Sequence, residues 1–177
     1  MDNILVFDYN DEVTAEPTFA MPEPGKYRVR FSEVKIEPVT LSSGETVNVL
    51  KTKLDMSGST SNIFHDVWLQ SGMKVSKAGN SYDAGEFTSR ALKQIYNSFA
   101  KVEDGEKDLG KWVGAVGAAD IAIKGYVKKD GTDGKKVEVK RWLPLDEQDE
   151  LPAWGVTQTV EEKVADAVGD DTIPFAL

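Results

Sequence analysis

Few residues of this chain have the chemistry that a catalytic or metal site needs. The 177 residues include no cysteine and a single histidine, His65. The chain therefore has no thiol nucleophile, thiolate metal ligand or disulfide framework. His65 and Asp66 could act as a base and its orienting acid, but neighbouring residues of a strand point to opposite faces. A structural or surface histidine is the better interpretation, and we predict no metal site.

Two short patterns look like ligand loops but lack the context that such loops need. Gly105–Lys111 has the glycine spacing of a phosphate-binding P-loop, yet Trp112 stands where a serine or threonine should ligate magnesium. Asp130 and Asp133 lie in a glycine-containing hairpin loop without the other ligands of a calcium loop. Acids in such loops are usually turn formers. We therefore expect a protein that is not an enzyme and has no cofactor.

The net charge of −9 is distributed unevenly along the chain. Residues 1–25 hold six acids and no base, and residues 144–177 hold nine acids and one base. Residues 26–143 keep 20 of the 21 bases and 15 acids, a net charge of +5. Such a division favours a body that binds a polyanion, although scattered surface charge can also divide in this way by chance.

Aromatic residues beside lysines are the strongest sign of a binding surface. Single-stranded nucleic acid needs a basic track for its phosphates and aromatic faces for its bases, each stacked base contributing roughly 1–3 kcal/mol. Alternation places Tyr126 on one strand face with Lys124 and Lys128, and Trp142 on a face with Lys140. An aromatic residue of a small barrel is nevertheless more often part of the core, by roughly two to one. The predicted DNA-binding residues are Arg28, Arg30, Lys51, Lys53, Phe64, Trp68, Lys74, Lys77, Tyr82, Lys124, Tyr126, Lys128, Lys140, Arg141 and Trp142.

Period-two patterns predict the strands that position these residues. In Gly25–Ile36 the apolar set slips by one residue after Phe31, which indicates a β-bulge near Ser32 and Glu33. Pro38 is expected to end this strand. Four further strands are predicted at Thr46–Met56, Asn62–Leu69, Asp120–Lys128 and Val137–Leu143.

One segment has the helical period instead. Apolar residues between Glu86 and Ala100 recur at helical spacing and predict an amphipathic helix. The polar residues 71–85 before it are expected to form a long flexible loop. The resulting order of three strands, one helix and two strands is that of an OB-fold, a five-stranded Greek-key barrel with its helix between strands three and four. We therefore predict a mainly β protein.

The ends of the chain are predicted to lie outside this barrel. Residues 1–24 are expected to form an acidic N-terminal arm, residues 25–144 the OB-fold domain, and residues 145–177 a disordered acidic tail. No apolar run approaches the ~20 residues of a membrane helix, and the N-terminus lacks the pattern of a secretory signal. A cytoplasmic protein is expected.

Two features resemble known families. The FDYN…PGKYRVRFSEVK segment with the strand and helix order after it resembles the OB-fold single-stranded-DNA-binding proteins of bacteriophages, over roughly residues 4–144. The C-terminal DDTIPF segment is similar to the acidic tip of bacterial single-stranded-DNA-binding proteins, which docks on replication and repair partners. The matching residues are Asp170, Asp171, Ile173, Pro174 and Phe175, but Ala176 and Leu177 follow where the bacterial tip ends.

The resemblance implies a sequence-independent binder of single-stranded DNA that acts in phage replication or recombination. Its tail would dock on partner proteins and would also occupy the DNA groove as a weak competitor, in the cytoplasm of the host cell. The alternative is an OB-like interaction module that captures a host protein. Tyr126, Trp142 and Trp68 discriminate between the two, because burial of these rings in the barrel would favour the interaction module.

Overall fold

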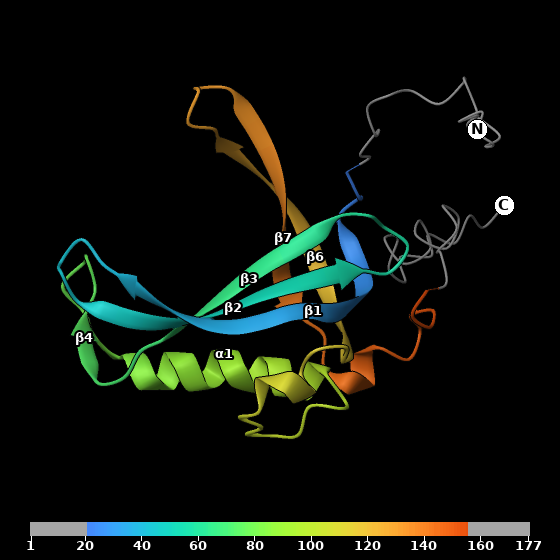
Figure 1. Cartoon of the computed structure of the whole chain (residues 1–177), viewed down its shortest axis with the longest axis horizontal. Helices are drawn as coiled ribbons and strands as arrows, with labels where there is room; N and C mark the ends of the chain where they lie inside the picture. The colour runs from blue at the N-terminus through green and yellow to red at the C-terminus, as the bar shows by residue number, and fades with distance from the viewer. Residues whose placement is uncertain (1–20, 156–177) are drawn as a thin grey trace, which may run out of the picture.

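An antiparallel sheet and one helix make up most of the computed structural model, which describes residues 21–155 (Figure 1). The sheet has five strands in the order β3–β2–β1–β6–β7. Its strands are β1 (Gly25–Thr40), β2 (Thr46–Met56), β3 (Asn62–Leu69), β6 (Val116–Val127) and β7 (Asp133–Trp142). A small hairpin of β4 (Met73–Val75) and β5 (Ser81–Asp83) leads into helix α1 (Ala84–Ser98). Within residues 21–155, no helix is long and apolar enough to cross a membrane.

Strand β1 is the element that both halves of the sheet share. It pairs with β6 from Gly25 to Arg30 and with β2 from Val29 to Thr40. The register with β2 shifts between Phe31 and Glu33, which confirms the bulge that the apolar slip predicts. The predicted end at Pro38 is wrong, because Pro38 pairs with Asn48 and the strand continues. Pro38 lies beyond the β6 pairing, at an edge where a missing N–H is tolerated.

Helix α1 begins two residues before its predicted start. The Asp83 carboxylate accepts hydrogen bonds from the N–H groups of Gly85 and Glu86, at 2.9 and 3.4 Å, and so caps the helix. The predicted loop 71–85 instead contains the β4–β5 hairpin. Lys74 of this hairpin donates to Glu45 at 3.0 Å, which ties it to the turn between β1 and β2. Three-residue strands are too short to produce a recognisable alternation.

The core is built from aromatic rings that meet between the sheet and α1. Phe31 of β1 stacks on Phe99 at 4.3 Å and lies 5.5 Å from Trp112, which is 1% exposed. Trp142 of β7 packs on the other edge of Phe99 at 5.5 Å and meets His65 of β3 at 5.2 Å. The edge strands β3 and β7 therefore touch through side chains, but no strand pairing closes the sheet in the described part of the chain.

The body extends past the predicted boundary at residue 144. Gln148 is 3% exposed and donates to the carbonyl oxygens of Ser98 and Leu143, at 2.9 and 2.7 Å. Arg28 donates to the Gln148 side chain at 3.0 Å and to the carbonyl oxygens of Gln148, Leu151 and Pro152. Residues 145–155 are thus part of the folded body. The rest of the predicted tail, with its DDTIPF tip, and residues 1–20 of the predicted arm lie outside the described residues.

Candidate nucleic-acid interface

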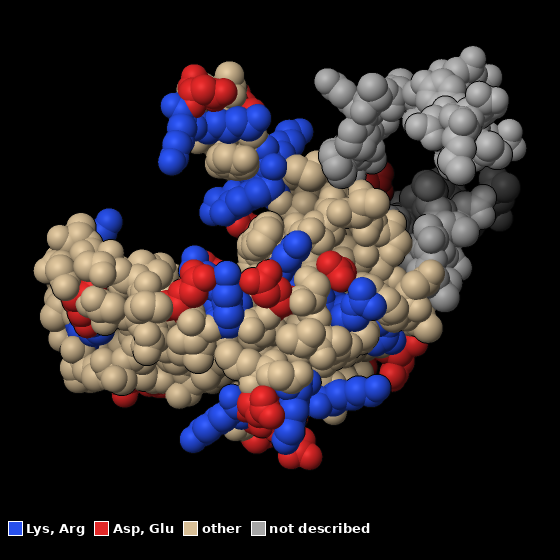
Figure 2. All heavy atoms as spheres, viewed as in Figure 1, with Lys and Arg blue, Asp and Glu red and all other residues tan. Residues whose placement is uncertain are grey.

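The β6–β7 hairpin projects from the sheet as a basic arm (Figures 1 and 2). Residues 124–140 contain six lysines and three acids, and Figure 2 shows the arm above a hollow in the surface. Asp130 closes the turn by accepting hydrogen bonds from the N–H and hydroxyl groups of Thr132, which lower the pKa of its carboxyl. This acid therefore forms the turn, and lysine side chains dominate the charge of the arm.

One face of the arm presents a tyrosine among lysines. Tyr126 lies opposite Gly134 and is 45% exposed, and Lys124 lies directly opposite Lys136 in the same ladder. Like charges directly opposite each other in a sheet are destabilising. Lys136 lies 3.7 Å from Glu138, whereas Lys124 has no ion pair among the described residues. An anion bound between Lys124 and Lys136 would relieve this repulsion. The ring of Tyr126, on the same strand face, offers a stacking surface.

Trp142, the other predicted stacking residue of this hairpin, belongs to the core instead. Ile121 pairs with Val139 and Asp120 pairs with Arg141, so Lys140 is an extra residue of a β-bulge. The bulge turns Trp142, which is 6% exposed, onto the inner face. Trp142 is therefore not available to stack on a base, and the simple alternation that placed it beside Lys140 was wrong.

An aromatic groove of about 760 Å³ lies between β3, the β4–β5 hairpin and the start of α1. Trp68, Tyr82 and Phe87 line it and are accompanied by the amide side chains of Gln70 and Asn80. Trp68 is 42% and Phe87 58% exposed, and Tyr82 meets Phe87 edge-on at 5.4 Å. The groove therefore combines ring faces with hydrogen-bonding groups, which is the chemistry that nucleobases need.

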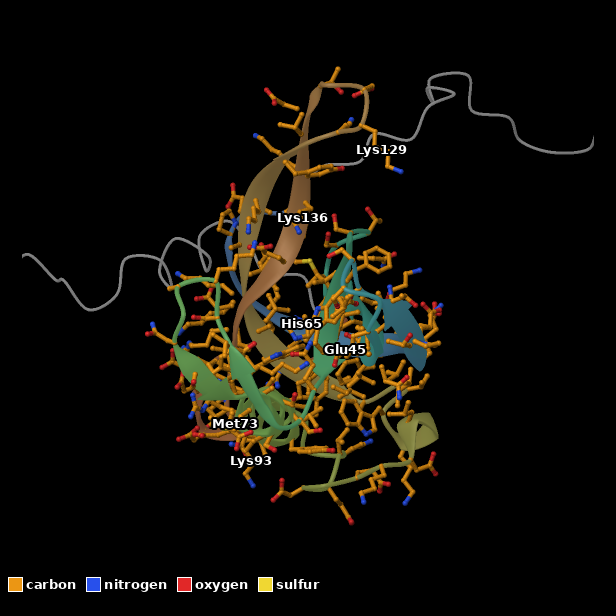
Figure 3. All side chains as sticks on the ribbon, turned by 90° about the vertical axis from the view of Figure 1, so that its left-hand side faces the viewer. Glu45, His65, Met73, Lys93, Lys129 and Lys136 are labelled. Atoms are coloured by element: carbon orange, nitrogen blue, oxygen red, sulfur yellow. The ribbon has the colours of Figure 1, made fainter. Side chains whose placement is uncertain are left out.

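Thr88 and His65 form part of the wall of this groove. Thr88 of α1 donates its hydroxyl to the carbonyl oxygens of Trp68 and Gln70, at 2.9 and 3.0 Å, and so holds the helix against the end of β3. His65 also lines the groove, and burial lowers the pKa of its imidazole while the nearby Asp66 acts in the opposite direction. Figure 3 shows His65 beneath the arm that carries Lys129 and Lys136.

Several predicted phosphate-binding residues make contacts within the protein. Arg30 pairs with Asp55 at 3.0 Å and lies 4.6 Å from the centre of the Trp154 ring. Arg141 donates to both carboxylate oxygens of Glu147, at 3.1 and 2.7 Å, which raises the pKa of Arg141. Arg28 anchors residues 148–152, as described above. The structure therefore gives the three predicted arginines roles within the fold.

The outer face of β2 and β3 carries mixed charge. Phe64 is 71% exposed beside Lys53, its partner in the ladder. Lys51 lies between Glu37 and Asp66, at 3.8 and 4.0 Å. A phosphate backbone would meet carboxylates along this face. Of the predicted DNA-binding residues, the structure thus brings Trp68 and Tyr82 together in the groove and places Lys124, Tyr126, Lys128 and Lys140 on the arm.

The groove also contains Phe87, which is not among the predicted DNA-binding residues. Phe87 belongs to the apolar stripe that predicts the helix, yet it lies in the first turn and is 58% exposed, whereas Ile95 and Phe99 are fully buried. Its place one residue after the first-turn Glu86 was the available sign. Lys77, in the exposed turn of the β4–β5 hairpin, is the nearest predicted lysine in sequence to this groove.

No protein-family model matches the sequence, and no curated protein matches it.

Proposed function

We propose that this protein is a non-catalytic, largely sequence-independent binder of single-stranded DNA. The observation that carries the proposal is the arm, where the exposed ring of Tyr126 lies beside the opposed lysines Lys124 and Lys136. A stacking surface and the positive charge of Lys124, which has no ion pair among the described residues, match the two parts of a nucleotide. Stacking is sequence-tolerant because every base has an aromatic face.

The aromatic groove supplies a second place for bases. Trp68, Tyr82 and Phe87 offer ring surface, and the Gln70 and Asn80 amides can donate to and accept from base edges. Stacking on the rings would supply most of the affinity, and the amides a modest preference among bases. Phosphates would lie along the lysines of the arm rather than along Arg28, Arg30 and Arg141, whose guanidinium groups are already engaged.

The fold and the setting form part of the same proposal. The strand order, the bulged β1 and the side-chain contact of His65 with Trp142 across the open side of the sheet support an OB-type barrel. The resemblance to phage proteins suggests a role on strands exposed during phage replication or recombination, in the host cytoplasm. The DDTIPF tip would dock on a protein partner.

The test is intrinsic tryptophan fluorescence during titration with poly(dT), at low and then at moderate salt. Trp68 is the tryptophan of the groove and is 42% exposed, so we expect quenching in the wild type and much weaker quenching in Trp68→Phe. If about four lysines neutralise phosphates, the logarithm of the binding constant should fall with the logarithm of salt with a slope of about −3. A salt-independent binding constant would refute the phosphate track.

A matched pair of lysine variants locates that track. Lys124→Gln should weaken binding and reduce the salt slope by about 0.7, the value for one phosphate of a single strand. Lys111→Gln removes the same charge from a lysine that pairs with Glu106 at 3.0 Å, in a loop at the opposite end of the molecule from the arm (Figure 1). This control should bind as the wild type does. Equal losses in both variants would indicate an effect of net charge alone.

A second function has specific support. The burial of Trp142 and the internal contacts of the arginines leave a shorter basic track than the sequence predicts, as expected for an OB-like module that captures a host protein. Exposed Trp68 and Tyr126 favour DNA. Absence of both quenching and a mobility shift with single-stranded DNA at low salt would leave the interaction module as the function.

A further inference from the structure

The backbone conformation at residue 134 of the arm does not require a glycine. Its φ is not in the positive region that favours glycine, so an alanine would fit the local conformation. The space above it is the constraint. A Cβ atom at this position would lie 2.8 Å from Cζ and 2.9 Å from Cε1 of Tyr126, and 3.0 Å from Cε of Lys128. Real Cβ contacts essentially never fall below 3.0 Å, so the ring would have to move.

The missing side chain lets two neighbours lean across β7. The Tyr126 ring lies over Gly134, its partner in the ladder, and the alkyl chain of Lys128 reaches the same spot. Tyr126 is nevertheless 45% exposed, so part of its side chain remains open to solvent. The Tyr126 ring and the end of the Lys128 alkyl chain thus lie next to each other over Gly134.

We propose that Gly134 is a positioning residue for DNA: it lets Tyr126 lie flat over β7, so that the ring stacks on a base while Lys128 meets the adjacent phosphate. The inference rests on the proposed function and adds a nucleotide subsite of defined composition. A side chain at residue 134 would tilt the ring, reduce the exposed stacking face and separate it from Lys128.

A purely structural explanation makes a different prediction. Aromatic residues opposite a glycine stabilise β-sheets by covering it, so Tyr126 could serve only to strengthen the arm. In that case Gly134→Ala would change the melting temperature of the protein and leave its DNA affinity unaltered. A positioning role requires the affinity itself to change.

The experiment compares two glycines of the same hairpin in the full-length protein. A Cβ at Gly125 would meet only the Gly134 carbonyl oxygen, at 3.9 Å, so Gly125→Ala is a control with the same change in composition. Affinity for a fluorescent dT oligonucleotide should fall about ten-fold in Gly134→Ala and in Tyr126→Ala, the size of one lost stack. Gly125→Ala should bind as the wild type does.

The double variant and an NMR measurement separate the possible failures. Gly134→Ala should cause no further loss in the Tyr126→Ala background; effects that multiply, or wild-type affinity of Gly134→Ala, would overturn the inference. The Gly134 Hα resonances should be shifted upfield by the Tyr126 ring in the free wild type and not in Tyr126→Ala. A normal Hα shift would overturn the geometry even if DNA binds. Failure of the wild type to bind DNA would refute the proposed function and this subsite together.

Discussion

The two ends of the β6–β7 hairpin use the same sequence signature for opposite purposes. Trp142 at the root and Tyr126 at the tip each follow a lysine by two residues, yet Trp142 is 6% and Tyr126 45% exposed. The difference comes from the bulge at Lys140, which shifts the root by one residue and leaves the tip in register. Flanking lysines therefore do not reveal which way a ring points; the strand register does.

Two glycines repeat this contrast. A Cβ on Gly117, in β6 near the root, would lie 2.9 Å from the Phe99 ring, much as one on Gly134 would meet Tyr126. Phe99 is fully buried and stacked on Phe31, so the glycine at the root makes room for packing. At the tip no core covers Tyr126. The same local arrangement brings one ring into the core and leaves the other exposed.

The largest expected effect is at the root. Trp142→Ala should destabilise the protein by about 3–5 kcal/mol, because it leaves a cavity against Phe31, Phe99 and His65. Urea unfolding followed by circular dichroism measures this. Tyr126→Ala is the matched change at the tip and should cost less than about 1 kcal/mol, since Tyr126 is 45% exposed and lies outside the core. Equal losses would contradict the division between root and tip.

The second prediction concerns residues 145–155, which follow β7 and belong to the folded body. Gln148→Ala should destabilise the protein by about 2–4 kcal/mol, because it leaves the carbonyl oxygens of Ser98 and Leu143 buried without their donor. Asp146→Ala, at an exposed position of the same segment, should change stability by less than about 0.5 kcal/mol. Urea unfolding of both variants tests this, and similar values would show that residues 145–155 add little to the fold.

The sequence predicts much of the fold, because most of its strands are long and amphipathic. The bulge of β1 could be read from the sequence because Tyr27, Val29 and Phe31 are followed by Val34 and Ile36, out of step. The bulge of β7 leaves a similar trace: Val137 and Val139 match Trp142 only if one residue is skipped. The β7 bulge is hard to predict from this trace, because an unbroken alternation is also formed by Val137, Val139, Arg141 and Leu143. Only the pairing with Asp120 and Ile121 resolves the ambiguity.

The site was less predictable than the fold. Lys124, Tyr126 and Lys128 are exposed as predicted, but so are Gly125 and Val127 between them, because this part of the arm extends beyond the core. The internal contacts of Arg28 and Arg30 were not predictable, because Gln148 lies 120 residues from Arg28 and the pairing of Arg30 with Asp55 depends on the register of β1 and β2. The sequence shows that an arginine is charged but does not show what its charge already contacts.

The third prediction compares DNA affinity at the tip and in the groove. Tyr126→Ala should weaken binding of a dT oligonucleotide about ten-fold, and Trp68→Ala should do the same if both rings stack on bases. Fluorescence anisotropy with a labelled oligonucleotide measures both. Phe64→Ala, on the mixed-charge face, is the control and should leave affinity unchanged. A loss in Phe64→Ala equal to that in Tyr126→Ala would shift the DNA path to the outer face of β2 and β3.

The smallest effect concerns the pH dependence of the root, through His65. Burial lowers the pKa of the imidazole below its usual 6.5, so between these two pKa values the unfolded chain binds a proton that the folded one does not. Stability should therefore fall as pH decreases through 6.5 and level off below the folded pKa. Carboxyl groups with a lowered pKa, such as Glu147, lose their contribution to stability only below about pH 4.5, in a separate range.

Urea unfolding between pH 7.5 and about 5 should show this slope in the wild type and a flatter profile in His65→Gln. Parallel profiles would mean that His65 is as accessible to protons in the folded root as in the unfolded chain, contrary to its contact with Trp142.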